Sequence, residues 1–326
     1  MDLHFLVAYD PVKYAVPGFV LLVALEMVVA RFRDRTRYEP RDTLTSLALG
    51  LGSTVAGALT AGIVYAVAVW VWQFRLFDIG YAWYWFAIAF VIDDLAYYVF
   101  HRMAHRVRWF WASHVIHHSS QHYNLSTALR QTWTGLVSLG FIFRLPLALI
   151  GFPPEMLLFV GAINLIYQFW IHTEVVGRCP RWFEAVMNTP SHHRVHHATN
   201  ARYLDKNYAG VFIIWDKMFG TFEPERDDDR PRYGIVHNLG SFNLIWAAFH
   251  EWVGIARDVW AAPGWRAKLG YMVMPPGWSH DGSRDTSEII KERWLEKQRR
   301  AEGAQWKKPI SSSSEEDRAG APPQAA

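Results

Sequence analysis

The sequence has a single cysteine, Cys179, so the chain can form no internal disulfide, which suits a protein facing a reducing compartment such as the cytoplasm. Charged residues make up 19% of the 326 residues and are scarce in the first half. The net charge of +3 comes without a dense basic stripe, so we expect no nucleic acid partner. The H-E-x-x-H motif is missing, since His250-Glu251 lacks a second histidine at the right step, which disfavours zinc hydrolysis.

Two further signals are missing. The first apolar run has no basic flank before it and no small-residue cleavage site after it, so we expect no removable signal peptide. No internal repeat of fixed period is present, which argues against a repeat architecture.

Hydrophobic residues, in contrast, make up 51% of the chain and aromatic residues 16%. Several apolar runs reach the length of about 20 residues that crosses a bilayer. The second is long enough to tilt, or to form two helices bent at its glycines. We therefore predict an all-α integral membrane protein with four to six membrane helices. The runs cover residues 14–30, 44–72, 82–100, 132–152 and 156–171.

The charge of the loops predicts the orientation. Five arginines between residues 31 and 41 follow the first run, which marks that side as cytoplasmic. The N-terminus then lies outside. Counting spans from there returns the chain to the cytoplasm at His101 and again at His172, so the histidine-rich segments and the C-terminus are predicted on the cytoplasmic side.

We divide the chain into four parts. Residues 1–81 are predicted as N-terminal membrane helices and residues 82–225 as the catalytic part, with a cytosolic helical cap over a histidine-rich site. In residues 226–282, a cytosolic or interfacial segment, apolar residues recur at three- and four-residue steps over 241–260. That helix either lies on the membrane surface or packs beneath the site. Residues 283–326 are predicted to be largely disordered beyond a helix at 288–300.

Ten of the fifteen histidines fall within two clusters, at residues 101–122 and 192–197. Residues three or four apart share a helix face, so histidines at this spacing can converge on a metal ion. Their number exceeds the need of one tetrahedral ion and favours two adjacent metals. His172, at the end of the fifth run, is a ninth candidate. The predicted ligands are His101, His105, His114, His117, His118, His172, His193, His196 and His197.

Other polar residues near the clusters have two open interpretations. His122 and His192 lie outside the ligand spacing, and act either next to the ligands or substrate or only in packing. Asp94 lies seven residues before His101, where a carboxylate can accept the outer N–H of a metal-bound imidazole. The alternative for Asp94, and for Asp93 beside it, is an acid at a helix end that faces interfacial water.

Single histidines elsewhere, at positions 4, 237 and 280, are expected to be ordinary surface or packing residues. After the second histidine motif, Asn124, Thr127 and Arg130 follow closely, and we expect them to form hydrogen bonds around it.

The order H-x-x-x-H, H-x-x-H-H, H-x-x-H-H after paired apolar spans resembles the fatty acid hydroxylase superfamily, which includes sterol desaturases. The surrounding residues are similar to its alkylglycerol monooxygenase-like branch, over roughly residues 80–225. The matching stretches are D-L-A-Y-Y-V-F-H-R-M-A-H (94–105), H-H-S-S-Q-H-Y-N-L-S-T-A-L-R (117–130), Q-F-W-I-H-T-E (168–174), N-T-P-S-H-H-R-V-H-H (188–197) and the segment 205–222.

This resemblance implies a non-haem di-iron centre that uses O₂ and electrons to hydroxylate or desaturate a lipid entering from the membrane. Zinc can occupy the same ligands in expressed protein. Tetrahydrobiopterin, the reductant of the alkylglycerol branch, or a redox partner protein would supply electrons. Some members have a histidine where this chain has Gln168, which implies an open or water-filled position on one metal.

Two alternatives stay open. Hydroxylation of an ether lipid, sterol or related isoprenoid and desaturation differ only in how the substrate carbon is placed. A membrane metal transporter or sensor would need polar groups along a path at the bilayer midplane, whereas the clusters lie at the ends of spans.

Overall fold

The computed structural model describes residues 3–32 and 38–306. Within these ranges the regular structure is helical, with only isolated β-bridges outside the helices, as predicted. The elements are η1 (His4–Ala8), α1 (Pro11–Ala30), α2 (Pro40–Trp72), α3 (Trp83–Arg106), α4 (Arg108–His118), α5 (Leu125–Ala128), η2 (Gly140–Arg144), α6 (Leu145–Ile150), α7 (Pro154–Trp170), α8 (Arg181–Glu184), α9 (Pro190–His196), α10 (Ile214–Met218), α11 (Leu244–Ala261), α12 (Gly264–Val273) and α13 (Ser287–Trp306).

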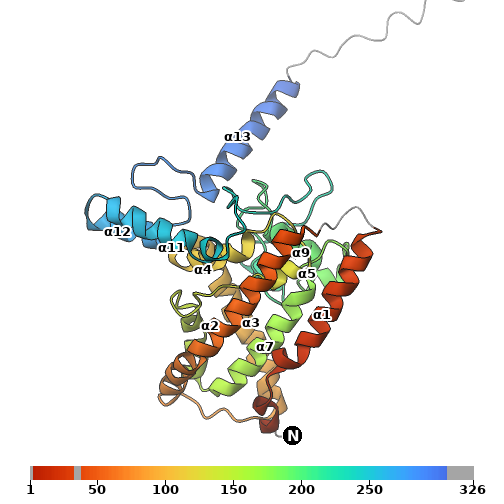
Figure 1. Ribbon diagram of the computed structural model, residues 1–326, viewed down its shortest axis with the longest axis vertical. Coiled ribbons are helices and arrows are strands. Elements are labelled where there is room, and N and C mark those ends of the chain that lie inside the picture. Colours follow the sequence, from red (N-terminus) through yellow and green to blue (C-terminus); the bar gives the residue numbers. More distant parts are fainter. Residues whose placement is uncertain (1–2, 33–37, 307–326) are drawn as a thin grey trace, which may run out of the picture.

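Three of these helices, α1, α2 and α3, are long and apolar enough to cross a membrane. Helix α2 is one continuous helix of 33 residues, so its glycines do not divide it in two. The 17-residue α7 runs beside them (Figure 1) and is apolar but shorter. The fold therefore carries membrane-length helices, and the full count of four to six crossings stays a prediction.

The apolar run at 132–152 does not form the expected long helix. Only η2 and α6 are helical there, because Leu139 adopts a left-handed backbone with φ of 59° and Pro146 lacks an N–H. Side chains bond the non-helical backbone instead. Ser113 Oγ donates to the Thr134 carbonyl at 3.0 Å, and Trp109 Nε1 donates to the Val137 carbonyl at 3.2 Å.

The long helices place the histidine-bearing elements at one end of the bundle, opposite η1 (Figure 1). Helix α3 ends there and α4 follows after one residue, while α7 ends there two residues before His172. Inside the bundle, Arg144 forms an ion pair with the buried Asp93 at 2.6 Å, which neutralises that carboxylate. The two predicted clusters thus meet at the same end.

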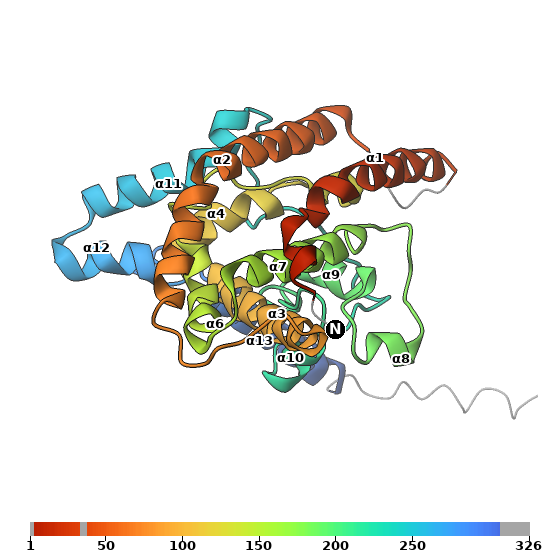
Figure 2. The ribbon, with the colours of Figure 1, turned by 90° about the horizontal axis from the view of Figure 1, so that it is seen from below.

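The C-terminal part forms a hairpin of α11 and α12 and then α13. The expected helix at 241–260 is present as α11, whose N-cap Asn243 accepts a hydrogen bond from Trp246 N at 2.9 Å. The α11–α12 hairpin projects sideways from the bundle in both views (Figures 1 and 2). Helix α13 is longer than the predicted 288–300, and the predicted disorder at 307–326 lies outside the described residues.

Candidate metal centre

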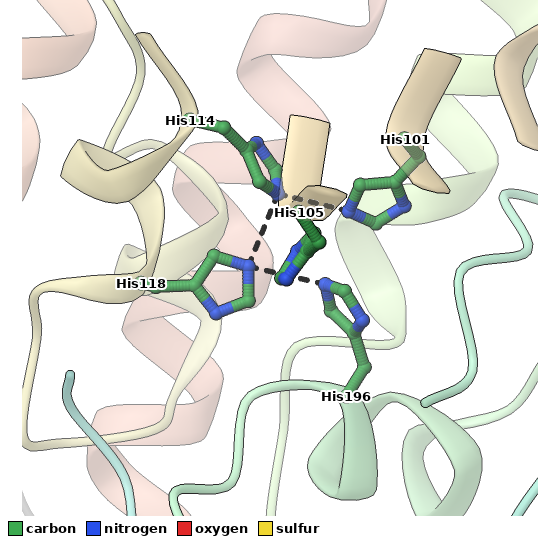
Figure 3. Close-up of side chains that lie close together, drawn as sticks. All are labelled: His101, His105, His114, His118 and His196. Atoms are coloured by element: carbon green, nitrogen blue, oxygen red, sulfur yellow. Dashed lines mark hydrogen bonds between the residues drawn. The ribbon is translucent and has the colours of Figure 1, made fainter. Parts of the chain in front are cut away.

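All nine predicted histidine ligands lie together, in two adjacent groups that could each hold a metal ion. In both groups the ring nitrogens lie within 4.8 Å of one another. Figure 3 shows the rings of the larger group pointing toward a common centre. The five-histidine group contains His101, His105, His114, His118 and His196, and the four-histidine group contains His117, His172, His193 and His197.

Helix geometry explains how the histidines divide between the groups. On α4, His114 and His118 share a face at i and i+4, whereas His117 points about 100° away from His118 and joins the other group. His196 and the following His197 separate in the same way at the end of α9. The groups touch where the rings of His118 and His197 stack at 4.4 Å.

Backbone carbonyls hold the outer nitrogens of four rings. Nδ1 lies 2.7 Å from the Tyr208 carbonyl in His101 and 3.0 Å from the Lys206 carbonyl in His196. In the other group, the corresponding distances are 2.8 Å from His172 to Gln168 and 3.3 Å from His117 to Arg130. A carbonyl only accepts, so Nδ1 carries the proton and Nε2 keeps its lone pair, as metal-bound imidazoles require.

The pair His117 and His172 tests whether a cation fits. Their Nε2 atoms lie 3.1 Å apart, although both carry lone pairs by the argument above. Burial lowers the pKa of His117 to about 4 and that of His172 well below its ordinary value, so a shared proton does not explain this approach. Two ligands at about 2.1 Å from one ion, at right angles, lie about 3 Å apart. The donor set therefore fits a metal ion.

Residues 205–208 support the five-histidine group through three contacts that the sequence interpretation missed. Besides the carbonyls of Lys206 and Tyr208, the Asp205 carboxylate lies 3.4 Å from His105 Nδ1. Burial opposes ionisation of Asp205, yet the bond to His105 and nearby cations lower its pKa. Asp205 and Asn207 have φ of 53° and 56°, and Asp and Asn tolerate this left-handed conformation best after glycine. The Asp and Asn of the D-K-N-Y stretch were a sequence signal for this backbone conformation, but they did not indicate contacts with the histidines.

The predicted bond between Asp94 and a ligand histidine is wrong. Among the described residues, the donors to its carboxylate are Val211 N at 2.8 Å, Phe212 N at 2.9 Å and Trp215 Nε1 at 2.9 Å, together with the side-chain amide of Asn164 at 2.8 Å. His101 uses the Tyr208 carbonyl instead. Asp94 therefore anchors the segment that carries this carbonyl, one step away from the histidine.

His122 and His192 belong to neither histidine group. The backbone carbonyl of His122 accepts from Thr127 Oγ1 at 3.1 Å, which closes the turn before α5. The ring of His192 lies 4.0 Å from Glu184 and packs edge-on against Phe222. Burial lowers the pKa of His192 to about 4. Neither ring touches a predicted ligand directly, so their proposed part in catalysis has no support from this geometry.

Buried side chains fix the elements around the histidines, as predicted for the residues after the second motif. Arg130 donates to the carbonyl of Ile116 at 3.1 Å and to Ser119 at 3.0 Å, and it pairs with Asp42 on α2. Asn124 and Thr127 form a capping box at α5.

Two further anchors were not anticipated. Arg194, between the histidines of α9, forms two bonds to Glu225 at 2.9 and 2.7 Å and donates to the Thr173 carbonyl at 2.9 Å. Glu26 on α1 accepts from Leu125 N at 2.7 Å and from the Thr173 hydroxyl. Both fix the loop that follows His172.

A cavity of about 490 Å³, here called the cap cavity, reaches the five-histidine group. Its lining includes His105, His118 and His196. It also includes His250 and Glu251 of α11 and several residues between 276 and 290. The lining mixes apolar and polar side chains, so the cavity can take a ligand with both characters.

Comparison with known proteins identifies a family domain within the chain. Residues 86–221 match the family model named Fatty acid hydroxylase. This part of the chain is a fatty acid hydroxylase domain. All nine histidines of the two groups lie inside the matched residues. No solved structure matches the chain.

The relatives that match this chain include named lipid enzymes. Alkylglycerol monooxygenase from Homo sapiens is 43% identical over 273 residues, which cover 82% of this chain and 60% of the relative. The Caenorhabditis elegans enzyme of that name is 40% identical over 255 residues, 74% of this chain and 50% of the relative. Cholesterol 25-hydroxylase from Homo sapiens is 30% identical over 142 residues, 40% of this chain and 48% of the relative. The chain thus spans only about half to three fifths of these relatives.

Proposed function

We propose that this chain is a membrane-bound, non-haem di-iron oxygenase that hydroxylates a C–H bond of a lipid. The observation that carries the proposal is the meeting of nine histidines, from separate stretches of sequence, at one end of apolar helices. The names of the relatives support alkylglycerols as the first substrate class to test.

The histidines supply the ligands for two iron ions, one in each group. Iron bound there would bind and activate O₂, which is the chemistry that oxidises an unactivated carbon. One oxygen atom enters the C–H bond as a hydroxyl group and the other leaves as water, using two electrons and two protons from an external reductant. Tetrahydrobiopterin and a redox partner protein are the two candidate donors.

The other residues position these ligands and shape the space beside them. The carbonyls of Tyr208 and Lys206 and the carboxylate of Asp205 keep three rings in the tautomer that offers Nε2. The cap cavity gives the substrate carbon room next to His105, His118 and His196. We propose that the histidine end of the bundle faces the cytoplasm, where the electron donor is available.

The test uses the purified chain in lipid nanodiscs, loaded with iron and supplied with an alkylglycerol, a reductant and ¹⁸O₂. We expect about two iron ions per chain, in line with two histidine sites, and one ¹⁸O atom in the lipid product. His117→Ala and His196→Ala, one from each group, should each abolish product. His122→Ala, whose ring lies outside both groups, is the matched control and should retain activity.

Three outcomes would count against this proposal. Full activity in both His117→Ala and His196→Ala would refute the oxygenase proposal. An unsaturated product without ¹⁸O would assign desaturation. Metal flux across proteoliposomes, without oxidised lipid, would assign transport. The position of both groups at helix ends, rather than along the spans, favours oxidation over transport.

A further inference from the structure

Helix α11 exposes most of its large apolar side chains. Turned toward the surroundings are Phe242, just before the helix, and then Ile245, Trp246, Phe249, Val253 and Trp260, whose exposed fraction is 88%. Turned toward the protein are the charged side chains of Glu251 and Asp258, which bond Arg108 at 2.6 Å each. A helix on a water-facing surface exposes mainly polar side chains, so this apolar outer face fits an apolar environment.

Helix α11 packs against a membrane-length helix whose own apolar side chains are exposed. Ala247 and Ala248 on the inner side of α11 pack against Leu49 of α2. On the same half of α2, Leu44 and Leu51 are exposed by 65% and 70%. In Figure 1, α11 and α12 run across the direction of α2, as a helix lying in the plane of a membrane surface would.

The charges around this face have one sign. In residues 241–275, all of which the structure describes, the exposed charged side chains are Arg257, Arg266 and Lys268. The exposed Trp260 and Trp265 lie in the same hairpin, and indole rings favour the boundary between lipid and water. Basic side chains beside an apolar face attract anionic lipid headgroups.

We propose that the α11–α12 hairpin is an interfacial anchor that lies in the headgroup layer of an anionic bilayer, with the outer face of α11 in the acyl chains. A second copy of the chain fits the outer face of α11 less well than a bilayer does. Two identical faces meeting about a twofold axis would bring the same three basic side chains together without exposed acids to pair with them.

The anchor also separates the lipid from the cap cavity. His250 and Glu251 line that cavity from the inner side of α11, while Ile245 and Phe249 face outward. If the chain has the proposed function, a lipid substrate passes from the headgroup layer over this hairpin to reach the five-histidine group.

The experiment measures the depth of single labels in Cys179→Ser protein, reconstituted in nanodiscs that contain one chain and anionic phospholipid. A nitroxide is placed at Ile245→Cys or Phe249→Cys. Leu25→Cys on the exposed side of α1 is the lipid control, and Glu296→Cys on α13 is the water control. Collisions with O₂ and with a water-soluble nickel complex are then compared by electron paramagnetic resonance.

We expect the α11 labels to behave like the label at position 25, with frequent O₂ collisions and few nickel collisions. Nickel collisions as frequent as at position 296 would overturn the proposal, because α11 would then face water. Protection from both reagents, developing only when two chains share a nanodisc, would overturn it in favour of self-association.

A charge-reversal variant tests the lipid class. Arg257→Glu, Arg266→Glu and Lys268→Glu together should move the Phe249→Cys label toward water in anionic bilayers and have little effect in neutral ones. Reversal of Lys297, Arg299 and Arg300 on α13 is the matched control and should leave the depth unchanged. Equal depth in the α11–α12 variant and the parent would refute the anionic contact. These readouts need no turnover, so their failure is separate from failure of the oxygenase proposal.

Discussion

The Asp94 carboxylate on α3 accepts a hydrogen bond from the backbone N–H of Val211 at 2.8 Å, across 117 residues of sequence. The same carboxylate accepts from Phe212 N and Trp215 Nε1. Because Tyr208 precedes these residues and its carbonyl holds His101, the buried acid sets the position of a histidine that it does not touch.

Replacing Asp94 should therefore weaken metal binding and folding together. Asp94→Ala leaves several buried donors without an acceptor, at about 1–3 kcal/mol for each. We expect a lower unfolding temperature and, because such supports are worth about 10–100-fold in metal affinity, a weaker five-histidine site. Chelator competition and thermal unfolding measure the two effects. Asp78→Ala, on an exposed loop, is the control, and equal behaviour of both variants would contradict this role.

Asp205 should tune one group and spare the other. Asp205→Ala removes the carboxylate next to His105 Nδ1, so the five-histidine group should lose about 10–100-fold in metal affinity while the four-histidine group is unchanged. Stepwise titration of metal-free protein with Co²⁺, followed by absorbance, resolves the two sites. Asp228→Ala removes an exposed acid and should leave both steps in place. Equal weakening of both steps by Asp205→Ala would show a general effect on the fold.

Gly210 lies where the anchored segment passes close to α3. A Cβ there would lie 2.8 Å from Asp94 Oδ1 and 2.9 Å from Asn164 Oδ1, closer than packed atoms allow. We expect Gly210→Ala to destabilise the fold by about 1–3 kcal/mol through overpacking. Gly57→Ala on α2, where a Cβ meets nothing within 4 Å, should be neutral or stabilising. Thermal unfolding of both variants checks the contrast.

His192 should make the protein acid-sensitive. Burial, followed by the nearby Lys217, lowers its pKa to about 4, below the ordinary 6.5. Between these two pH values, the His192 ring is protonated in the unfolded chain and neutral in the folded chain. The stabilisation present above pH 6.5 is therefore lost as the pH falls toward 4. Between pH 7 and pH 5, we expect the free energy of unfolding of the wild type to fall by about 2 kcal/mol more than that of His192→Gln. Denaturant unfolding at saturating metal measures both free energies. An equal fall in the two proteins would contradict the prediction.

The sequence alone determined the helical class, the membrane-length runs and the set of histidines that meet. It could do so because helix periodicity and apolar run length are local properties. The number of histidines at this spacing also favoured two adjacent metals, since one tetrahedral ion uses fewer ligands.

Only the tertiary structure decided which groups hold the rings and how the chain returns through the bundle. Every residue has a backbone carbonyl, so the sequence does not single out those of Tyr208 and Lys206. Their contacts with His101 and His196 depend on a loop that folds back from far along the chain. The same holds for Asp94, whose partners are mainly backbone N–H groups, and for the apolar stretch before η2, where side chains replace helical hydrogen bonds. Local patterns specify which residues can bond, and only the assembled chain specifies which of them do.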